Sequence, residues 1–137
     1  MADPFDSPTP FVGLTGIEIT EASADTVVGR IVVSEIHHQP YGVVHGGVYS
    51  TLVETLGSTG AAIWAIEQGM QGAVGVSNQT DFLRATKEGV LVGTATPIHR
   101  GRSQQLWQVV VIRDTDGKPA ARGQVRLQNV ADIGAFG

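Results

Sequence analysis

The chain has 137 residues, of which 42% are hydrophobic and 16% charged, and its formal net charge is −4 at pH 7. This length suits one ordinary domain and is too short for two, and an acidic chain without a basic run is a poor candidate for binding nucleic acid or an anionic membrane. The absence of cysteine excludes disulfides, thiolate metal sites and cysteine nucleophiles. A typical domain has about 25% charged residues, so the low charge also favours an oligomer.

The N-terminal segment differs in composition from the rest of the chain. Residues 1–12 hold three prolines, so we expect a flexible lead over 1–12, one domain over 13–130 and a tail over 131–137. The N-terminus lacks the basic start and apolar stretch of a signal peptide, and no apolar run is long enough to cross a membrane. We therefore expect a cytoplasmic protein.

The first half of the domain predicts two strands, a loop and one long helix. Alternation around Ile17 and Ile19 predicts the first strand, and residues 26–33 predict the second. Residues 34–45 are expected to be a loop. The helix is predicted over 46–67, about 33 Å long, because apolar residues and one threonine follow a single helical stripe: Val48, Leu52, Leu56, Thr59, Ile63 and Ile66.

Four more strands are predicted after Gly69, which should end the helix. Their expected ranges are 73–84, 90–98, 103–113 and 120–130, with Asp116-Gly117 as a hairpin turn before the last. In the first of them, one face would carry Val74, Val76, Thr80 and Phe82. The order strand-strand-helix-strand-strand-strand-strand has connections too short for crossover helices. It predicts an α+β fold, an antiparallel sheet curled around one central helix.

Glu54 lies about 200° around the predicted helix from the apolar stripe. The other residues on its face are small: Ser50, Gly57, Ser58 and Ala61. A solvated helix face usually carries long charged side chains, so this face predicts the close approach of a second subunit or a ligand. Ser58, one turn beyond Glu54, can hydrogen-bond its carboxylate.

His45 stands directly before two glycines at the predicted start of the helix. The first N–H groups of a helix have no intrahelical partners, and they can stabilise an oxyanion on a carbonyl under attack. Gly46 and Glu54 are about 12 Å apart along the axis, so one carbonyl carbon cannot touch both. If both act, the site must combine two subunits. The histidines lack metal-ligand spacing, and no metal site is predicted.

The motif Gln39-x-x-Gly42-x-x-His45-Gly46-Gly47, followed by Glu54 and Ser58, resembles that of the hotdog-fold acyl-CoA thioesterases. The branch it resembles contains the PaaI-type and 4-hydroxybenzoyl-CoA thioesterases. The resemblance covers residues 13–130, and a hotdog fold is a sheet wrapped around a helix, as expected above.

The resemblance implies a role for each residue of the motif. The Gly46 amide and the Gln39 side chain would polarise the thioester carbonyl, and Glu54 would act as nucleophile or as general base for water. Ser58 would hold the carboxylate or the water, and His45 would orient the carbonyl and the leaving group. Many PaaI-type members carry Asn and Asp at the positions of Gln39 and Glu54, so the Gln/Glu pair is closer to the aryl-thioester hydrolases.

A basic turn, residues 99–103, lies between two predicted strands of this acidic chain. Coenzyme A carries a 3′-phosphate and a pyrophosphate, which arginine binds well through paired hydrogen bonds. Together with the resemblance, this turn leads us to expect that the substrate contacts Arg100, Gly101, Arg102 and Ser103. The resemblance also implies substrate contacts at Gly47 and Asn78.

We therefore expect an enzyme that hydrolyses an acyl-CoA to free acid and thiol, and the expected substrate is an aromatic acyl-CoA or an aryl-carrier thioester. It would need no cofactor, coenzyme A being part of the substrate, and would form a homodimer or a dimer-of-dimers tetramer. Two alternatives stay open: a non-catalytic acyl-CoA-binding hotdog protein, and a hotdog hydratase or dehydratase. Analysis of the products distinguishes all three.

Overall fold

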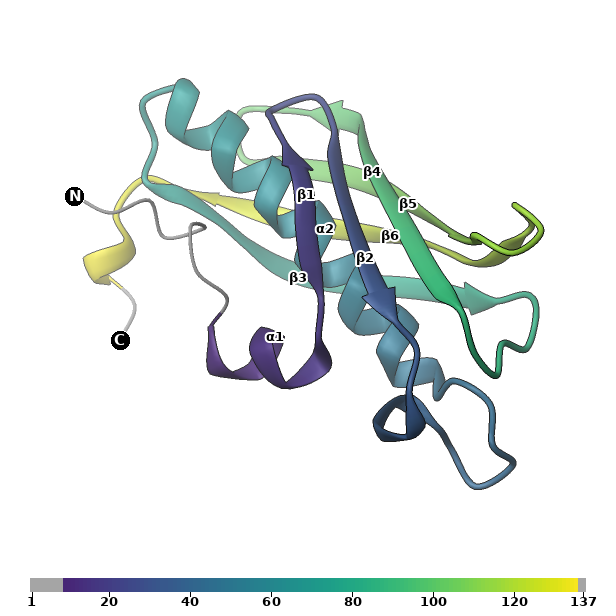
Figure 1. Ribbon diagram of the computed structural model, residues 1–137. Helices are drawn as coiled ribbons and strands as arrows, with labels where there is room; N and C mark the ends of the chain where they lie inside the picture. The colour runs from purple at the N-terminus through teal and green to yellow at the C-terminus, as the bar shows by residue number, and fades with distance from the viewer. Residues whose placement is uncertain (1–8, 136–137) are drawn as a thin grey trace.

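A computed structural model describes residues 9–135 and contains one long helix and six strands (Figure 1). The long helix, α2, spans Gly46–Glu67, as predicted. The strands are β1 (Glu18–Ala22), β2 (Val27–Val32), β3 (Gly72–Phe82), β4 (Val90–Arg100), β5 (Gln104–Arg113) and β6 (Pro119–Val130). Each strand lies within a few residues of its predicted position.

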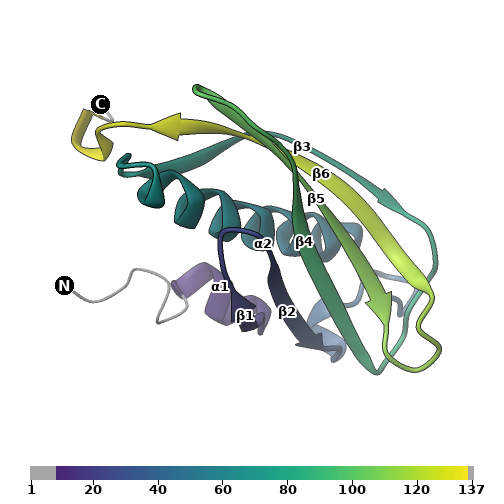
Figure 2. The same ribbon diagram turned by 90° about the horizontal axis from the view of Figure 1, so that it is seen from above.

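The six strands form one antiparallel sheet in the order β1-β2-β4-β5-β6-β3. Figure 2 shows the sheet curling around α2, which lies on its concave side. The core fills the space between them, and its largest fully buried side chains include Trp107, Ile31, Leu52, Leu56, Leu91 and Leu127. The predicted α+β architecture, an antiparallel sheet wrapped around one helix, is confirmed.

Local signals set both ends of α2. At its start the side chain of His45, the N-cap residue, accepts a hydrogen bond from the Gly47 N–H. At its end Gly69 adopts a positive φ of 88°, and the N–H groups of Gly69 and Met70 donate to the carbonyls of Ile66 and Ala65. This pattern is a Schellman motif, which satisfies the last carbonyls of a helix.

Glycine lets α2 lie unusually close to its own sheet. A Cβ atom on Gly57 would lie 2.3 Å from the Val125 side chain, and one on Gly60 would lie 2.5 Å from Trp107. Gly57 and Ala61 are buried inside the subunit, so the expectation that they face a second body is wrong. The curled sheet buries residues on several faces of α2, so the buried surface of the helix is wider than the predicted stripe. Ile66, the last residue of that stripe, is instead 47% exposed.

Strand β3 lies at an edge of the sheet and pairs only with β6 among the described strands. A β-bulge between Gly75 and Ser77 interrupts its register, so the predicted alternation does not continue along the strand. The prediction that Val74, Val76, Thr80 and Phe82 share one face is therefore wrong, and Val76 and Phe82 are 55% and 57% exposed within the subunit.

The N-terminal part of the described chain contains a short helix, α1 (Pro10–Thr15), which overlaps the predicted lead. Its Val12 packs against the core, and residues 1–8 lie outside the described chain. The predicted loop 34–45 contains a 3₁₀ turn, η1 (Glu35–His37), and η2 (Ile133–Ala135) lies in the predicted tail. Across residues 9–135, no helix combines the length and hydrophobicity that a membrane crossing requires.

Candidate active site

Glu54 is half-buried on α2 and faces the edge strand β3. Its Oε1 lies 3.5 Å from the Ser58 Oγ, and its Oε2 accepts a hydrogen bond of 3.3 Å from the Asn78 Nδ2. A Cβ atom on Gly75 would lie 2.0 Å from Oε1, so the carboxylate occupies the space that the glycine leaves. The structure thus brings the predicted Glu54 and Ser58 together and adds Asn78 and Gly75 to them.

The N-terminus of α2 presents one free amide. The Gly47 N–H is held by the Nδ1 of His45 at 2.8 Å, so this amide is already occupied. Within residues 9–135, the Gly46 N–H has no hydrogen-bond acceptor. Because Nδ1 accepts a hydrogen bond, the proton of a neutral His45 ring is on Nε2 and can be donated elsewhere.

Gln39 is held in a tight turn beside this amide. Its backbone N–H donates to the Val43 carbonyl, its carbonyl accepts from the Gly42 N–H, and Gly42 has a positive φ of 77°. The side-chain Oε1 accepts a hydrogen bond from the Tyr41 N–H. The side-chain NH₂ has no acceptor in the described part of the chain and can donate to a ligand.

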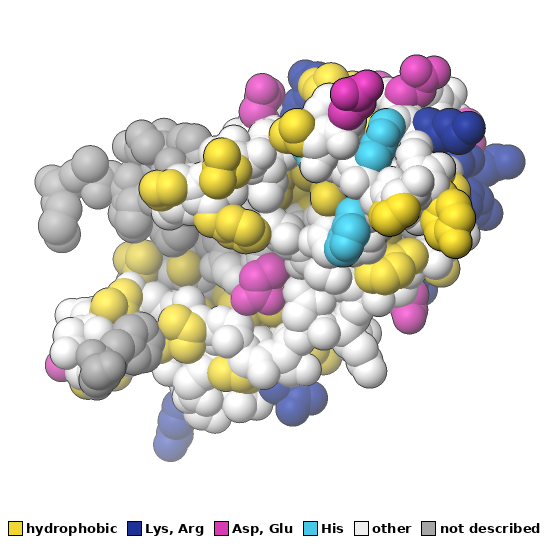
Figure 3. Space-filling view, turned by 90° about the horizontal axis from the view of Figure 1, so that it is seen from below, with side chains coloured by type: hydrophobic (Ala, Val, Ile, Leu, Met, Phe, Trp, Pro, Cys, Tyr) yellow, Lys and Arg dark blue, Asp and Glu magenta, His cyan; other side chains and the backbone are white. Residues whose placement is uncertain are grey.

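A cavity of about 280 Å³ opens at this helix start. It is lined by Gln39, Val43, Val44, Gly46, Tyr49, Phe82, Leu83, Arg84 and Ala85. The Tyr49 and Phe82 rings lie 5.9 Å apart at an angle of 32°, and both residues line the cavity together with Gln39 and Gly46. Figure 3 shows hydrophobic side chains gathered around a hollow on this side of the molecule, with acidic and histidine side chains beside it.

The cavity and Glu54 do not meet within one subunit. Eight residues of α2 separate Gly46 from Glu54, which is about 12 Å of helix. The carboxylate faces the exposed edge strand, so a second subunit placed there could supply a cavity to it.

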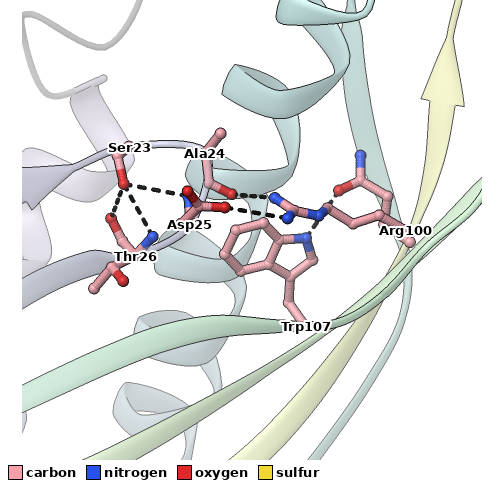
Figure 4. A network of polar contacts seen from close by, with 7 residues as sticks. Ser23, Ala24, Asp25, Thr26, Arg100 and Trp107 are labelled. Atoms are coloured by element: carbon pink, nitrogen blue, oxygen red, sulfur yellow. Dashed lines mark hydrogen bonds and ion pairs between the residues drawn. The ribbon is translucent and has the colours of Figure 1, made fainter.

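The structure gives most of the basic turn internal partners. Arg100 donates to the Ala24 carbonyl at 2.6 Å, pairs with Asp25 at 3.1 Å and lies over the Trp64 ring at 5.5 Å. Figure 4 shows it reaching across to the turn between β1 and β2. The carbonyls of Gly101, Arg102 and Ser103 accept hydrogen bonds from Asn129.

The Arg102 side chain is exposed and has no partner within the described residues. It is therefore the member of the turn best placed to reach a phosphate. Trp64, beside the turn, is eighteen residues after Gly46, or about 27 Å along the helix. A contact between this turn and the substrate stays a prediction.

Sequence patterns alone did not identify Gly75, Tyr49 or Phe82 as part of the site. Tyr49 lies three residues after Gly46, so its place on the first helical turn could have suggested it. The place of Gly75 beside Glu54 depends on the β-bulge and on the pairing of β3 with β6, and neither leaves a local signal in the sequence.

Comparison with known proteins places the chain in a family. The model of the Thioesterase superfamily matches residues 41–120, more than half of the chain. The chain belongs to the Thioesterase superfamily. This match includes the helix start, Glu54 and all of β3, and it confirms the resemblance seen in the sequence.

Individual relatives of the superfamily agree with this assignment. A Mycobacterium tuberculosis protein named "Putative esterase Rv1847" is 44% identical over 128 residues, covering 93% of this chain and 91% of the relative. Its structure covers 90% of this chain and 98% of that one, with a TM-score of 0.87. Proofreading thioesterase EntH of Klebsiella pneumoniae is 34% identical, covering 77% and 75%.

A third relative is also named as a thioesterase. The structure of thioesterase HI1161 from Haemophilus influenzae is 30% identical, covers 93% of this chain and 87% of that one, and has a TM-score of 0.84. Membership of the superfamily makes the protein a thioester hydrolase, which favours the enzymatic expectation over the two alternatives.

Proposed function

We propose that the protein hydrolyses an aromatic acyl thioester of coenzyme A or of a carrier protein, at a site shared by two subunits. The observation that carries this proposal is the free Gly46 amide at an aromatic-lined cavity, with a single held carboxylate two turns further along the same helix. The cavity supports an aromatic acyl group because the exposed Phe82 ring, which packs against the buried Tyr49 ring, can stack on another ring.

In the proposed reaction the thioester oxygen accepts hydrogen bonds from the Gly46 N–H and the Gln39 NH₂. These donors are fixed before the reaction, so they stabilise the charge that develops on the oxygen. Glu54 of the other subunit either removes a proton from an attacking water or attacks the carbonyl carbon itself. In the first route the carbon–sulfur bond breaks and the leaving thiolate takes the proton that Glu54 removed from the water. In the second route the thiolate leaves a mixed anhydride with Glu54, which a water molecule then hydrolyses, giving one proton to the thiolate. Both routes yield a carboxylic acid and a thiol.

His45 has a supporting role in this scheme. Its Nδ1 accepts the hydrogen bond that caps the helix, and this bond fixes the orientation of the ring. The Nε2–H can then donate to the thioester carbonyl or to the departing sulfur. Ser58 can hold the Glu54 carboxylate or a water beside it. The scheme uses only side chains and one amide of this protein, and we propose that no metal or cofactor takes part.

The edge strand β3 supports a dimer. It exposes Val74, Val76 and Phe82 beside unpaired backbone groups, and such an edge is a template for pairing with another chain. We propose that two copies pair at β3, as a dimer or within a dimer of dimers, and place the Glu54 of each near the helix start of the other.

Replacing Glu54 tests the proposed chemistry. Glu54→Ala should lower kcat for release of thiol from an aroyl-CoA by about 10²- to 10⁴-fold, the usual contribution of a general acid or base. The matched control is Glu67→Ala, at the exposed end of the same helix, which should keep the wild-type rate. If Glu54→Ala keeps near-full kcat while folded, Glu54 has no part in the mechanism.

Mixed dimers test the shared site. Gln39→Ala and Glu54→Ala proteins, unfolded and refolded together in equal amounts, should form about half mixed dimers. If the two groups, about 12 Å apart along one helix, act from different subunits, one of the two sites in each mixed dimer is intact. Half of the dimers with one intact site of two should then return about a quarter of the wild-type activity. A mixture that never exceeds the sum of its parents means that the two residues act within one subunit.

The contact with the nucleotide is tested at the basic turn. Arg102→Ala should raise KM for coenzyme A esters more than it lowers kcat, because a remote phosphate is bound equally in the ground and transition states. Pantetheine thioesters lack the nucleotide and should be unaffected. An equal loss with both substrates would rule out the phosphate contact.

A further inference from the structure

We propose that Asn78, oriented by Thr80, is a positioning residue that fixes the Glu54 carboxylate for catalysis. This inference rests on the proposed function, in which Glu54 is the catalytic group. It also replaces the expectation that Asn78 contacts the substrate. Glu54 lies on α2, and Asn78 and Thr80 lie on β3 after its bulge.

Both hydrogens of the Asn78 amide are used on the helix that carries Glu54. Its Nδ2 donates to the Ser50 carbonyl at 3.0 Å and to the Glu54 Oε2 at 3.3 Å. In a helix the Ser50 carbonyl also accepts from the Glu54 backbone N–H. Asn78 therefore ties the carboxylate to the same helical turn that holds its own backbone.

The orientation of the amide is determined by its partners. The Ser50 carbonyl and the Glu54 carboxylate can only accept hydrogen bonds, so the nitrogen of the amide must face them. On the other side, the Thr80 Oγ1 donates to the Asn78 Oδ1 at 2.7 Å. Thr80 thus opposes a rotation that would turn the amide oxygen toward the carboxylate and repel it.

The β-bulge brings this pair to the carboxylate. Residues on alternate positions of a strand share a face, so Asn78 and Thr80 both point toward α2 while Gln79 points away. Gly75, at the start of the bulge, leaves room for the Oε1 on the other side of the carboxylate. On β3, Asn78 therefore holds the carboxylate at Oε2 while Gly75 leaves room for Oε1, and Ser58 on the same helix contacts Oε1 at 3.5 Å.

The first test removes the donors. Asn78→Leu is similar in size and should lower kcat with an aroyl-CoA by about 10- to 100-fold, the range for a hydrogen bond to a charged group, while KM changes less than about 2-fold. In a Glu54→Ala background, the same substitution should cause no further loss, because there is no carboxylate left to position. Gln79→Leu, on the opposite face, is the matched control and should keep the wild-type kcat.

The second test addresses the orientation of the amide. Thr80→Val removes the hydroxyl at nearly constant shape and should lower kcat by about 2- to 10-fold, whereas Thr80→Ser keeps the donor and should stay within about 2-fold of wild type. This pair also decides the question if Asn78→Leu does not fold. Circular dichroism and the midpoint of thermal unfolding check the fold of each variant.

Three results would overturn the inference. Full kcat in folded Asn78→Leu, or in Thr80→Val where Asn78→Leu is unfolded, would show that Glu54 needs no such support. An equal loss from Asn78→Leu with and without Glu54 would mean that Asn78 acts on the substrate itself. Equal losses from Thr80→Val and Thr80→Ser would remove the role of the hydroxyl. If instead Glu54→Ala itself keeps near-full kcat, the proposed function fails and this inference fails with it.

Discussion

Gly75→Ala should displace the Glu54 carboxylate without unfolding the protein. The added Cβ would lie 2.0 Å from the Oε1 and 2.9 Å from the Cδ of Glu54, where real contacts are essentially never shorter than 3.0 Å. The carboxylate must therefore move by about 1 Å or more, and a misplacement of this size can cost about 10²-fold in rate. Gly75 does not have a positive φ, so alanine fits its backbone.

The expected loss lies in kcat, measured by thiol release from an aroyl-CoA. Because the displaced atoms are the end of a flexible side chain, the free energy of unfolding in urea should change by less than about 1 kcal/mol. Gly13→Ala is the control, since its Cβ would meet nothing within 4 Å. Combined with Glu54→Asp, whose carboxylate is shorter, Gly75→Ala should add little further loss. A Gly75→Ala enzyme with wild-type kcat would refute the reasoning.

Three other substitutions test stability. Gly60→Ala places a Cβ 2.5 Å from the buried Trp107, so we expect a loss of about 1–3 kcal/mol in urea unfolding. Tyr49→Phe removes a buried hydroxyl that has no partner within the described residues, so the same measurement should show no loss of stability. Hydrogen bonds from the Arg113 side chain and the Lys118 backbone hold the pKa of Asp116 below its ordinary 3.8. The stability that these bonds give is therefore present above pH 3.8 and is lost as the pH falls below it. In Asp116→Asn, Tm should decrease less than in the wild type when the pH is lowered through this range.

The helix and the strands could be predicted because their signals are local. The Gly69 stop and the spacing of Leu52 and Leu56 mark α2, and the hairpin turn at Asp116-Gly117 lies between β5 and β6 as expected. The faces of the elements could not be predicted in the same way. Whether Gly57 meets a second subunit or Val125 of its own sheet depends on how strongly the sheet curls, which pairing across the whole chain decides.

The residues of the candidate site also differ in whether a local sequence signal predicts them. Glu54, Ser58 and the helix start at His45 follow from spacing along one helix, so the sequence alone identified them. The position of Asn78 beside Glu54 depends on a bulge that shifts the register of β3, and a one-residue shift exchanges the two faces of a strand. The internal partners of Arg100 are distant in sequence, so its ion pair with Asp25 could not be predicted from a local pattern either.

The close contact of α2 with its sheet has a consequence for the order of folding. The interior of the segment contains Gly57 and Gly60, each of which disfavours helix by about 1 kcal/mol relative to alanine. An isolated helix of this length is marginal even with good helix formers. The side chains that fill the spaces at Gly57 and Gly60 are Val125 and Trp107, which leave the ribosome about 50 to 70 residues later. During synthesis α2 therefore gains its main stabilisation only after β5 and β6 have emerged, and folding of the domain waits for the C-terminal strands.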